Sequence, residues 1–232
     1  QGFFKDAGIN LKPVVVAPGQ LSPTIMSGET DLSFDAIQGV LGSVSNGLPI
    51  KVVAQTSTNG EGAVGGTGRD LLVLKGSGIT SIAQLAGKKL GVQRLGAAGD
   101  VAVQALVERA NPKHKVKVLA LPSESMQTSL INGDVDAVNV SDPTASQMMA
   151  SGKFDALGDP PLAAFGSAPD KVVIATTKWI DANPKIVKAL QEAIARSDAY
   201  AQANVEAVRE GRVTDWKTPA DVAQLTHWPA FT

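Results

Sequence analysis

PGQLSPTIMSGETDLSFD, residues 18–35, is the stretch that decides the fold, because its pattern returns in PSESMQTSLINGDVDAVNVSD, residues 122–142. Each copy has a proline, a small polar opening and a helical stretch. Gly28 and Gly133 close the two helical stretches, and each is followed by an acid, any residue, an Asp and a strand. Glycine just past a helix adopts the left-handed conformation at little cost. The shared order predicts two similar lobes; the alternative is the helix–glycine–strand turn that many α/β units share.

Short β-branched runs alternate with helical patterns along the rest of the chain. Strands are predicted at Val14–Ala17, Leu32–Phe34, Val52–Ala54, Leu71–Leu74, Leu90–Val92, Val116–Ala120, Ala137–Val140 and Val172–Thr176. Helices are predicted at Ile37–Ser45, Ile82–Leu85, Asp100–Ala110, Ser125–Ile131 and Pro184–Ala203. Strands separated by helices of this size predict an α/β fold with parallel pairing and right-handed crossovers.

Composition narrows the class of protein. The 232 residues are 44% hydrophobic and 19% charged, which suits one large α/β domain or two small lobes and excludes intrinsic disorder. The net charge of −1 argues against nucleic-acid binding. Apolar runs are far shorter than the ~18 residues that cross a bilayer.

The chain has no cysteine and only two histidines, His114 and His227. Disulfides, zinc knuckles, thiol catalysis and iron–sulfur chemistry are therefore excluded, and little remains for histidine acid–base catalysis. The glycines at 60, 62 and 65 match a dinucleotide fingerprint in spacing, but no strand directly precedes them and no helix directly follows, so we interpret them as a loop. We predict no metal and no cofactor.

Several blocks match a known family in the same order along nearly the whole chain. They are GFFKDAGINL at 2–11, SGETDLSF at 27–34, GLPIKVVA at 47–54, GITSIAQLAGKKLGVQ at 78–93, NGDVDA at 132–137 with DP at 142–143, and WIDANP at 179–184. With these blocks the chain resembles the periplasmic substrate-binding proteins of ABC importers. The most similar group binds aliphatic sulfonates, taurine, nitrate and thiamine precursors.

The resemblance implies a type II periplasmic binding fold, in which two Rossmann-like lobes joined by two crossover strands close on a ligand. The first lobe would comprise 1–76 and 170–232, and the second 77–169. The family begins with a strand and a ligand-contacting loop upstream of Gly2, so we expect that N-terminal strand to be missing here through truncation or disorder. Ser141 stands where the family often has an aromatic residue, which implies a ligand other than the simplest alkyl sulfonates.

Ligand contacts are expected from loops at the carboxyl ends of strands, where open α/β sheets place their crevices. The predicted ligand-binding residues are Gly19, Gln20, Asp35, Ala36, Ile37, Gln38, Thr56, Asn59, Arg94, Gly96, Ala97, Ala98, Gly99, Ser123, Ser141 and Asp142. Most of these loops open helices, whose first amide groups favour anions.

Two kinds of predicted contact leave alternatives open. The small residues at 96–99 would let backbone amides approach a ligand, and Arg94 could bind a carboxylate or sulfonate through two hydrogen bonds. Arg94 could instead pair with Asp100 on the surface. Asp35 and Asp142 could accept from a ligand amine or hydroxyl, or cap the next helix; Pro143 favours capping for Asp142.

These patterns and the resemblance predict a non-enzymatic, monomeric solute-binding component of an ABC importer. It would capture a small sulfonate- or carboxylate-like anion by hinge closure and deliver it to a membrane permease. The expected location is the periplasm, or the outer face of the cytoplasmic membrane as a lipoprotein. One alternative is an enzyme of the same fold, such as thiamine-pyrimidine or menaquinone-pathway enzymes, although the former need a cysteine and histidines absent here. The other alternative is the ligand-sensing module of a receptor.

Overall fold

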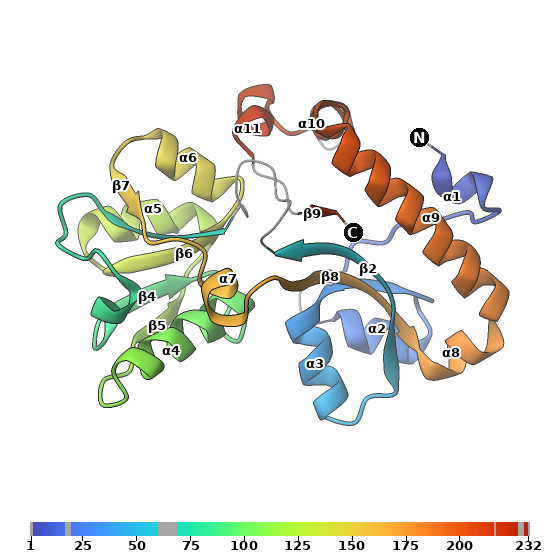
Figure 1. Ribbon diagram of the computed structural model, residues 1–232, viewed down its shortest axis with the longest axis horizontal. Helices are drawn as coiled ribbons and strands as arrows, with labels where there is room; N and C mark the ends of the chain where they lie inside the picture. The colour runs from blue at the N-terminus through green and yellow to red at the C-terminus, as the bar shows by residue number, and fades with distance from the viewer. Residues whose placement is uncertain (1, 17–19, 60–68, 216, 227–229, 232) are drawn as a thin grey trace. The chain divides into compact units, whose positions relative to one another are not determined.

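The computed structural model describes residues 2–16, 20–59, 69–215, 217–226 and 230–231. The chain divides into two compact units (Figure 1). Unit 1 comprises 1–58, 169–207 and 230–232, and unit 2 comprises 59–168 and 208–229. Among the described residues no helix is both long and apolar enough to cross a membrane.

Unit 1 is built on a four-stranded sheet of order β1-β8-β2-β9. Its strands are β1 (Ser33–Ala36), β2 (Ile50–Asn59), β8 (Ala168–Thr176) and β9 (Ala230–Phe231). The pairs β1–β8 and β2–β9 are antiparallel. Its helices are α1 (Phe3–Asp6), α2 (Leu21–Ser27), α3 (Ile37–Ser45), α8 (Thr177–Ala182) and α9 (Pro184–Ala203), and α10 (Val205–Thr214) begins in this unit.

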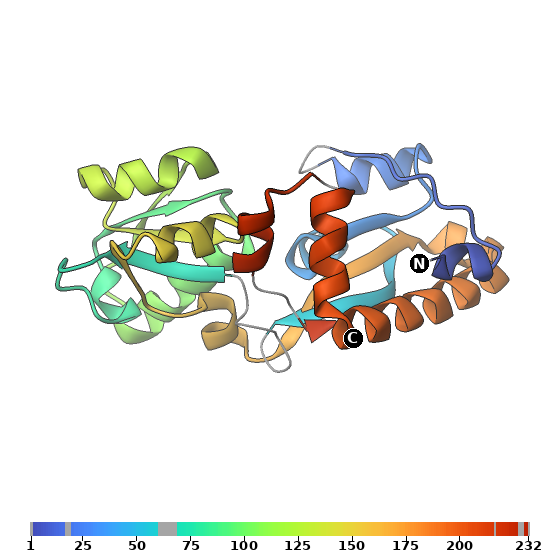
Figure 2. The ribbon, with the colours of Figure 1, turned by 90° about the horizontal axis from the view of Figure 1, so that it is seen from above.

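Helices cover both faces of this sheet. On one face Ile25 of α2 and Val40 of α3 pack against alternate residues of β8, Val172 and Ile174. On the other face α9 lies along the sheet (Figures 1 and 2), and its residues at 190 and 194 pack against β2 and β8. Successive residues of β8 therefore point alternately into two hydrophobic cores, one on each face of the sheet.

Unit 2 contains a five-stranded sheet of order β5-β4-β6-β3-β7. Its strands are β3 (Arg69–Leu74), β4 (Lys89–Val92), β5 (Lys117–Ala120), β6 (Ala137–Ser141) and β7 (Phe154–Ala156). β4 pairs in parallel with β5 and β6, whereas β3 is antiparallel to β6 and β7. Its helices are the 3-10 helix η1 (Ile82–Leu85), α4 (Ala98–Ala110), α5 (Ser123–Asn132), α6 (Thr144–Ala150), α7 (Pro160–Phe165) and α11 (Ala220–Leu225).

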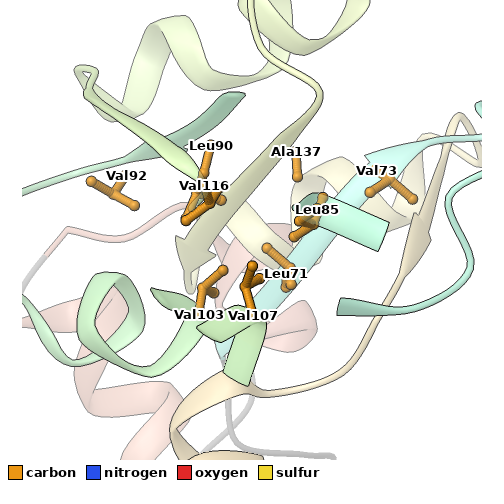
Figure 3. Close-up of a cluster of buried hydrophobic side chains, with 9 residues drawn as sticks. All are labelled: Leu71, Val73, Leu85, Leu90, Val92, Val103, Val107, Val116 and Ala137. Atoms are coloured by element: carbon orange, nitrogen blue, oxygen red, sulfur yellow. The ribbon is translucent and has the colours of Figure 1, made fainter. Parts of the chain in front are cut away.

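Buried side chains hold unit 2 together on both sides of its sheet. Leu71 of β3 packs with Val103 and Val107 of α4 (Figure 3), and all three are fully buried. The next residue, Leu72, points to the opposite face and packs with Met126 of α5. The apolar run of β3 is thus explained by a strand buried on both faces.

The predicted repeat is confirmed in two separate sheets. Gly28 ends α2 with φ 79° and Gly133 ends α5 with φ 77°, and both are in the left-handed conformation. β1 follows the first glycine in the four-stranded sheet, and β6 follows the second in the five-stranded sheet. Each of these strands has an antiparallel neighbour, β8 and β3 respectively.

Most predicted elements are confirmed, and the helices at 37–45 and 184–203 agree to the residue. The strand predicted at 14–17 is wrong for 14–16, which have no regular structure, and Ala17 lies outside the described residues. Val15 is fully exposed, at 101%. A β-branched run becomes a strand only where a neighbour supplies hydrogen bonds, and among the described residues β1 pairs with β8 alone.

The prediction of parallel pairing is right for β4, β5 and β6 and wrong for β3 and β8. The division predicted after residue 76 placed β3 in the first lobe, but β3 pairs with β6 and β7 in the sheet of unit 2. β2 and β3 lie in different sheets, and β3 takes its orientation from its partners β6 and β7, which lie far from it in the chain.

Asp198 of α9 is a buried carboxylic acid in unit 1. It is 8% exposed, and its Oδ2 has no hydrogen-bond partner within the described part of the chain. Burial raises the pKa of Asp198 from 3.8 to about 7, because desolvation disfavours the carboxylate. The folded protein therefore binds this proton more tightly than the unfolded chain does.

We predict that Asp198→Asn makes the folded protein more stable at high pH. The stability associated with a protonated Asp198 is fully present below pH 4 and is lost as the pH rises through about 7. The variant should gain about 1–3 kcal/mol in free energy of unfolding at pH 8 and little at pH 4, by urea denaturation at both pH values. Glu192→Gln, an exposed change on the same helix, is the control and should show no such dependence. Equal effects of Asp198→Asn at both pH values would contradict the prediction.

Candidate functional site

Unit 2 gathers three strand ends and three helix starts at one sheet edge. β4, β5 and β6 run parallel, so their carboxyl ends meet there, and α4, α5 and α6 begin just beyond them. The side chain of Gln93 donates a hydrogen bond to Ser123 Oγ at 2.7 Å and joins two of the loops. We call this region the carboxyl edge of unit 2. Of the predicted ligand-binding residues it contains Arg94, Gly96, Ala97, Ala98, Gly99, Ser123, Ser141 and Asp142.

The start of α4 has no side-chain cap. Ala97 is the N-cap residue and contributes no side-chain hydrogen bond. The first amide groups of a helix have no intrahelical acceptor, and together with the helix dipole they make this end partly positive. The first amide groups of the 13-residue α4 therefore lie at this edge, together with the carboxylate of Asp100 in the first turn.

Arg94 and Asp100 do not pair, so the alternative of an Arg94–Asp100 ion pair is wrong. Asp100 is 3% exposed, and its carboxylate accepts hydrogen bonds from the Gly96 amide at 2.8 Å and from Gln104 Nε2 at 2.5 Å. Arg94 is exposed, and its side chain has no ion pair or hydrogen bond within the described residues. The guanidinium is therefore available to an anion, whereas the carboxylate beside it is not.

Gly99 is required for packing against β6. A Cβ at this position would overlap the side-chain amide of Asn139, which would then have to move. Asn139 lies in register with Leu71 and Val92, and its Nδ2 donates to the Asp70 carbonyl at 3.4 Å. In this structure Gly99 is buried beneath Asn139, and the Gly96 amide donates to Asp100. The contact of this loop with a ligand stays a prediction.

Asp142 caps the next helix. Its Oδ1 accepts hydrogen bonds from the amide and the hydroxyl of Ser146, at 3.0 and 2.6 Å. The interpretation of Asp142 as a cap is confirmed. Ser141 is half-buried at the end of β6, opposite Arg69 in the β3 register.

Unit 1 brings a second group of predicted residues together around β8. Ala36 is the register partner of Lys171, and Thr56 Oγ1 donates to the Lys171 carbonyl at 3.2 Å. Ile37 and Gln38 follow directly in the first turn of α3, and Gln38 Oε1 is buried without a partner in the described residues.

Asp35 lies against the start of α3. Its Oδ1 accepts a hydrogen bond from the Ala36 amide at 2.7 Å, and a Cβ at Gly39 would lie 3.2 Å from Oδ2. The carboxylate lies beside the first turn of the helix, but the amide that it accepts from belongs to Ala36, the N-cap residue, and α3 has no side-chain cap, so the capping alternative for Asp35 is wrong.

Of the remaining predicted residues, only Gln20 is fully described. Gln20 precedes α2, whose Ser22 hydroxyl lies 3.0 Å from the Ser43 hydroxyl near the far end of α3, so Gln20 lies apart from Gln38. Gly19 lies outside the described residues. Asn59 ends β2, and only its backbone is described.

Two residues at these edges were not predicted, Asn139 and Lys171. Asn139 could have been noticed as a polar residue inside the apolar run 137–140. Lys171 carries no local signal, since its place beside Ala36 and Thr56 results from pairing between distant strands. Within the described residues no group of three or more His, Asp or Glu could hold a metal ion.

Comparison with known proteins establishes the family and the fold. The NMT1/THI5-like family matches residues 1–207. A search of curated protein sequences finds no match. Solved structures with this fold include binding proteins and an enzyme.

The alkanesulfonate-binding protein SsuA from Xanthomonas axonopodis pv. citri, bound to MOPS, has a TM-score of 0.75 and 17% identity, over 99% of this chain and 78% of that chain. The periplasmic nitrate-binding protein NrtA from Synechocystis PCC 6803 has a TM-score of 0.69 and 16% identity, over 95% and 63%. The desulfurization enzyme DSZB has a TM-score of 0.67 and 16% identity, over 99% and 78%. At these identities the likeness establishes the fold alone.

We predict that Gly99→Ala destabilises unit 2 through Asn139. The added methyl group overlaps the Asn139 amide, and overpacking of this kind costs about 1–3 kcal/mol in free energy of unfolding. The double variant Gly99→Ala/Asn139→Ala should lose less than the sum of the two single changes, because removing the amide makes room for the methyl group. Urea denaturation of all three variants measures this coupling.

Gly42→Ala serves as the matched control, since a Cβ there meets nothing within 4 Å and the residue lies in α3. It should leave the stability unchanged or raise it by up to about 1 kcal/mol. Additive losses in the double variant would show that Gly99 and Asn139 are not coupled.

Proposed function

The chain belongs to the NMT1/THI5-like family, and from this membership and its fold we propose that it is the solute-binding component of an ABC importer. In this role it captures a small organic anion and delivers it to a membrane permease. The proposed ligand class is sulfonate-like or carboxylate-like. The similarity to a sulfonate-binding and a nitrate-binding protein supports the choice of an anion.

The observation that carries the choice of an anion is the difference between Arg94 and two of the acids at this edge, Asp100 and Asp142; a third acid, Glu124 in the first turn of α5, is exposed. Asp100 and Asp142 direct their carboxylates to Gly96, Gln104 and Ser146, all within unit 2. Arg94 has no such partner among the described residues and lies beside the uncapped start of α4. A guanidinium can bind a carboxylate or sulfonate with two parallel hydrogen bonds. Arg94 and the α4 amides are therefore the proposed anion-binding groups.

Unit 1 supplies polar groups of a different kind. Gln38, Thr56 and Lys171 lie around the end of β1, where they could bind the remainder of the ligand. The proposal includes closure of the two lobes on the ligand, which excludes water and strengthens the few polar contacts. The proposed lobes are units 1 and 2, which differ from the lobes predicted from the sequence chiefly at 59–76 and 208–229, both assigned to unit 2.

We favour a binding role over an enzymatic one because the chain offers no cysteine and only two histidines for catalysis. His114 lies before β5, at the opposite end of that strand from the carboxyl edge of unit 2. An enzyme with this fold exists, so a turnover assay is part of the test. We propose a periplasmic location, or attachment to the outer face of the cytoplasmic membrane, where a permease would receive the ligand.

We predict that a panel of small anions contains at least one that raises the melting temperature. Ethanesulfonate, taurine, MOPS, nitrate and propionate are the probes, each measured by thermal shift, because a ligand that binds only the folded state stabilises it. The bound anion should also reduce the radius of gyration in small-angle scattering and remain chemically unchanged. A panel without any stabilising anion would count against the proposed function, and product formation would favour the enzyme.

We predict that Arg94→Ala weakens binding of the best anion. Loss of a charged hydrogen bond costs about 1.5–3 kcal/mol, which is about a 10- to 150-fold rise in Kd by calorimetry. Arg109→Ala is the matched control, because Arg109 is exposed, lies at the other end of α4 and donates to the Ala164 carbonyl. An unchanged Kd in Arg94→Ala would remove Arg94 from the site.

A further inference from the structure

Lysines gather at the edge of unit 2 opposite to the carboxyl edge. At this edge β4, β5, β6 and β7 begin and β3 ends, and it lies away from the arrowheads of β4 and β5 in Figure 1. We call the group the lysine edge. Its members are exposed and come from four of the five strands or the loops beside them: Lys75, Lys88, Lys89, Lys113, Lys115, Lys117 and Lys153.

The backbone holds these lysines in a row. Lys89 and Lys117 are register partners, and the Lys117 amide donates to the Lys88 carbonyl at 2.8 Å. On the other side of the sheet edge the Lys75 amide donates to the Lys153 carbonyl at 2.9 Å. The row therefore spans the sheet, which at about 4.8 Å between strands is about 19 Å across.

Core residues keep the row on the outside of the protein. Leu90 and Val116 are buried in the cluster that α4 covers, at 0% and 7% exposure. Because successive residues of a strand point to opposite faces, the lysines that flank these two residues cannot turn into that core. These flanking lysines stay out of the core under α4, and their place at the edge of the sheet leaves them exposed.

The lysine edge is strongly positive although the whole chain has a net charge of −1. The acids at this edge are Asp134, Asp136 and Asp155. The seven lysines exceed these three acids by four positive charges. Asp136 is occupied, since Oδ1 pairs with Lys88 Nζ at 3.7 Å and Oδ2 accepts from the Lys89 amide at 2.8 Å. Glu108 and Arg109 at the end of α4 cancel each other.

We propose that the lysine edge binds the surface of a bilayer that contains anionic phospholipids. The lysine side chain carries a compact ammonium charge on a flexible alkyl chain and lacks the planar guanidinium with which arginine recognises a single carboxylate or phosphate. A row of lysines therefore suits a broad anionic surface. Each lysine near such a surface contributes about 1 kcal/mol, and several acting together give measurable binding. The lysine edge and Arg94 lie at opposite edges of one sheet, so membrane contact would leave the proposed anion site open.

Co-sedimentation of the full chain with vesicles tests this proposal. Vesicles of phosphatidylcholine with about 30% phosphatidylglycerol should bind the protein at about 50 mM salt, and phosphatidylcholine alone should not. Raising the salt to about 300 mM should weaken binding at least about tenfold, because the charges are screened. Equal binding to neutral vesicles, or binding that is insensitive to salt, would overturn the proposal.

Charge-reversal variants locate the surface. Lys115→Glu/Lys117→Glu should reduce binding to the anionic vesicles at least about tenfold. The matched control Lys185→Glu/Lys188→Glu, two exposed lysines of α9 in unit 1, changes the net charge equally and should reduce it less than about twofold. Equal losses in both variants would show that net charge alone is responsible and would overturn the assignment to the lysine edge.

Two further measurements keep the result interpretable. Lys75→Gln/Lys153→Gln tests the other end of the row should the first variant unfold, and it should reduce vesicle binding as well. Binding to polyglutamate without binding to vesicles would identify an acidic protein as the partner and overturn the membrane assignment. Anion affinity in the thermal-shift panel should be unchanged in the lysine variants, so failure of this proposal is distinguishable from failure of the proposed function.

Discussion

Parallel pairing of β4 with β5 and β6 controls where the charged groups of unit 2 lie. Parallel strands begin at one edge of a sheet and end at the other, so helix starts collect at the ends of the strands and the returning loops collect at their beginnings. Arg94 follows β4 and lies with the helix starts, whereas Lys89 and Lys117 begin their strands and lie with the lysines. One hydrogen-bonding arrangement therefore separates the proposed anion site from the proposed membrane-binding edge.

At the carboxyl edge of unit 2, which charged groups are already hydrogen-bonded within the protein matters more than how many charged groups there are. Asp100 and Asp142 are next to helix starts, yet each is bound by groups of its own chain and offers little to a ligand. Asn139 places a neutral amide against Gly99 rather than another carboxylate. The positive end of α4 and the guanidinium of Arg94 remain for an anion. A count of acids and bases from the sequence would give this edge a net negative charge.

The two units show how far one pattern determines structure. Gly28 and Gly133 end their helices with nearly the same backbone angles, and β1 and β6 each have an antiparallel neighbour. The surroundings differ, because β6 also pairs with β4 while β1 pairs only with β8 among the described strands. The run at 14–16 stays irregular in unit 1, whereas the comparable run before α5 forms β5 beside β4.

Local patterns in the chain were sufficient for the α/β class, the repeat, the extent of α3 and α9, and Asp142 as a helix cap, because each depends on residues only a few positions apart. The family blocks were sufficient for the periplasmic-binding fold. Only the tertiary structure determined that β3 and β8 pair antiparallel with their neighbours and that Asn139 packs against Gly99. It also determined that, within the part of the chain that the structure describes, Asp100 is hydrogen-bonded while Arg94 is not. The reason is physical: hydrogen bonds and packing between distant residues depend on which strands become neighbours, and hydrophobic periodicity carries no record of that choice.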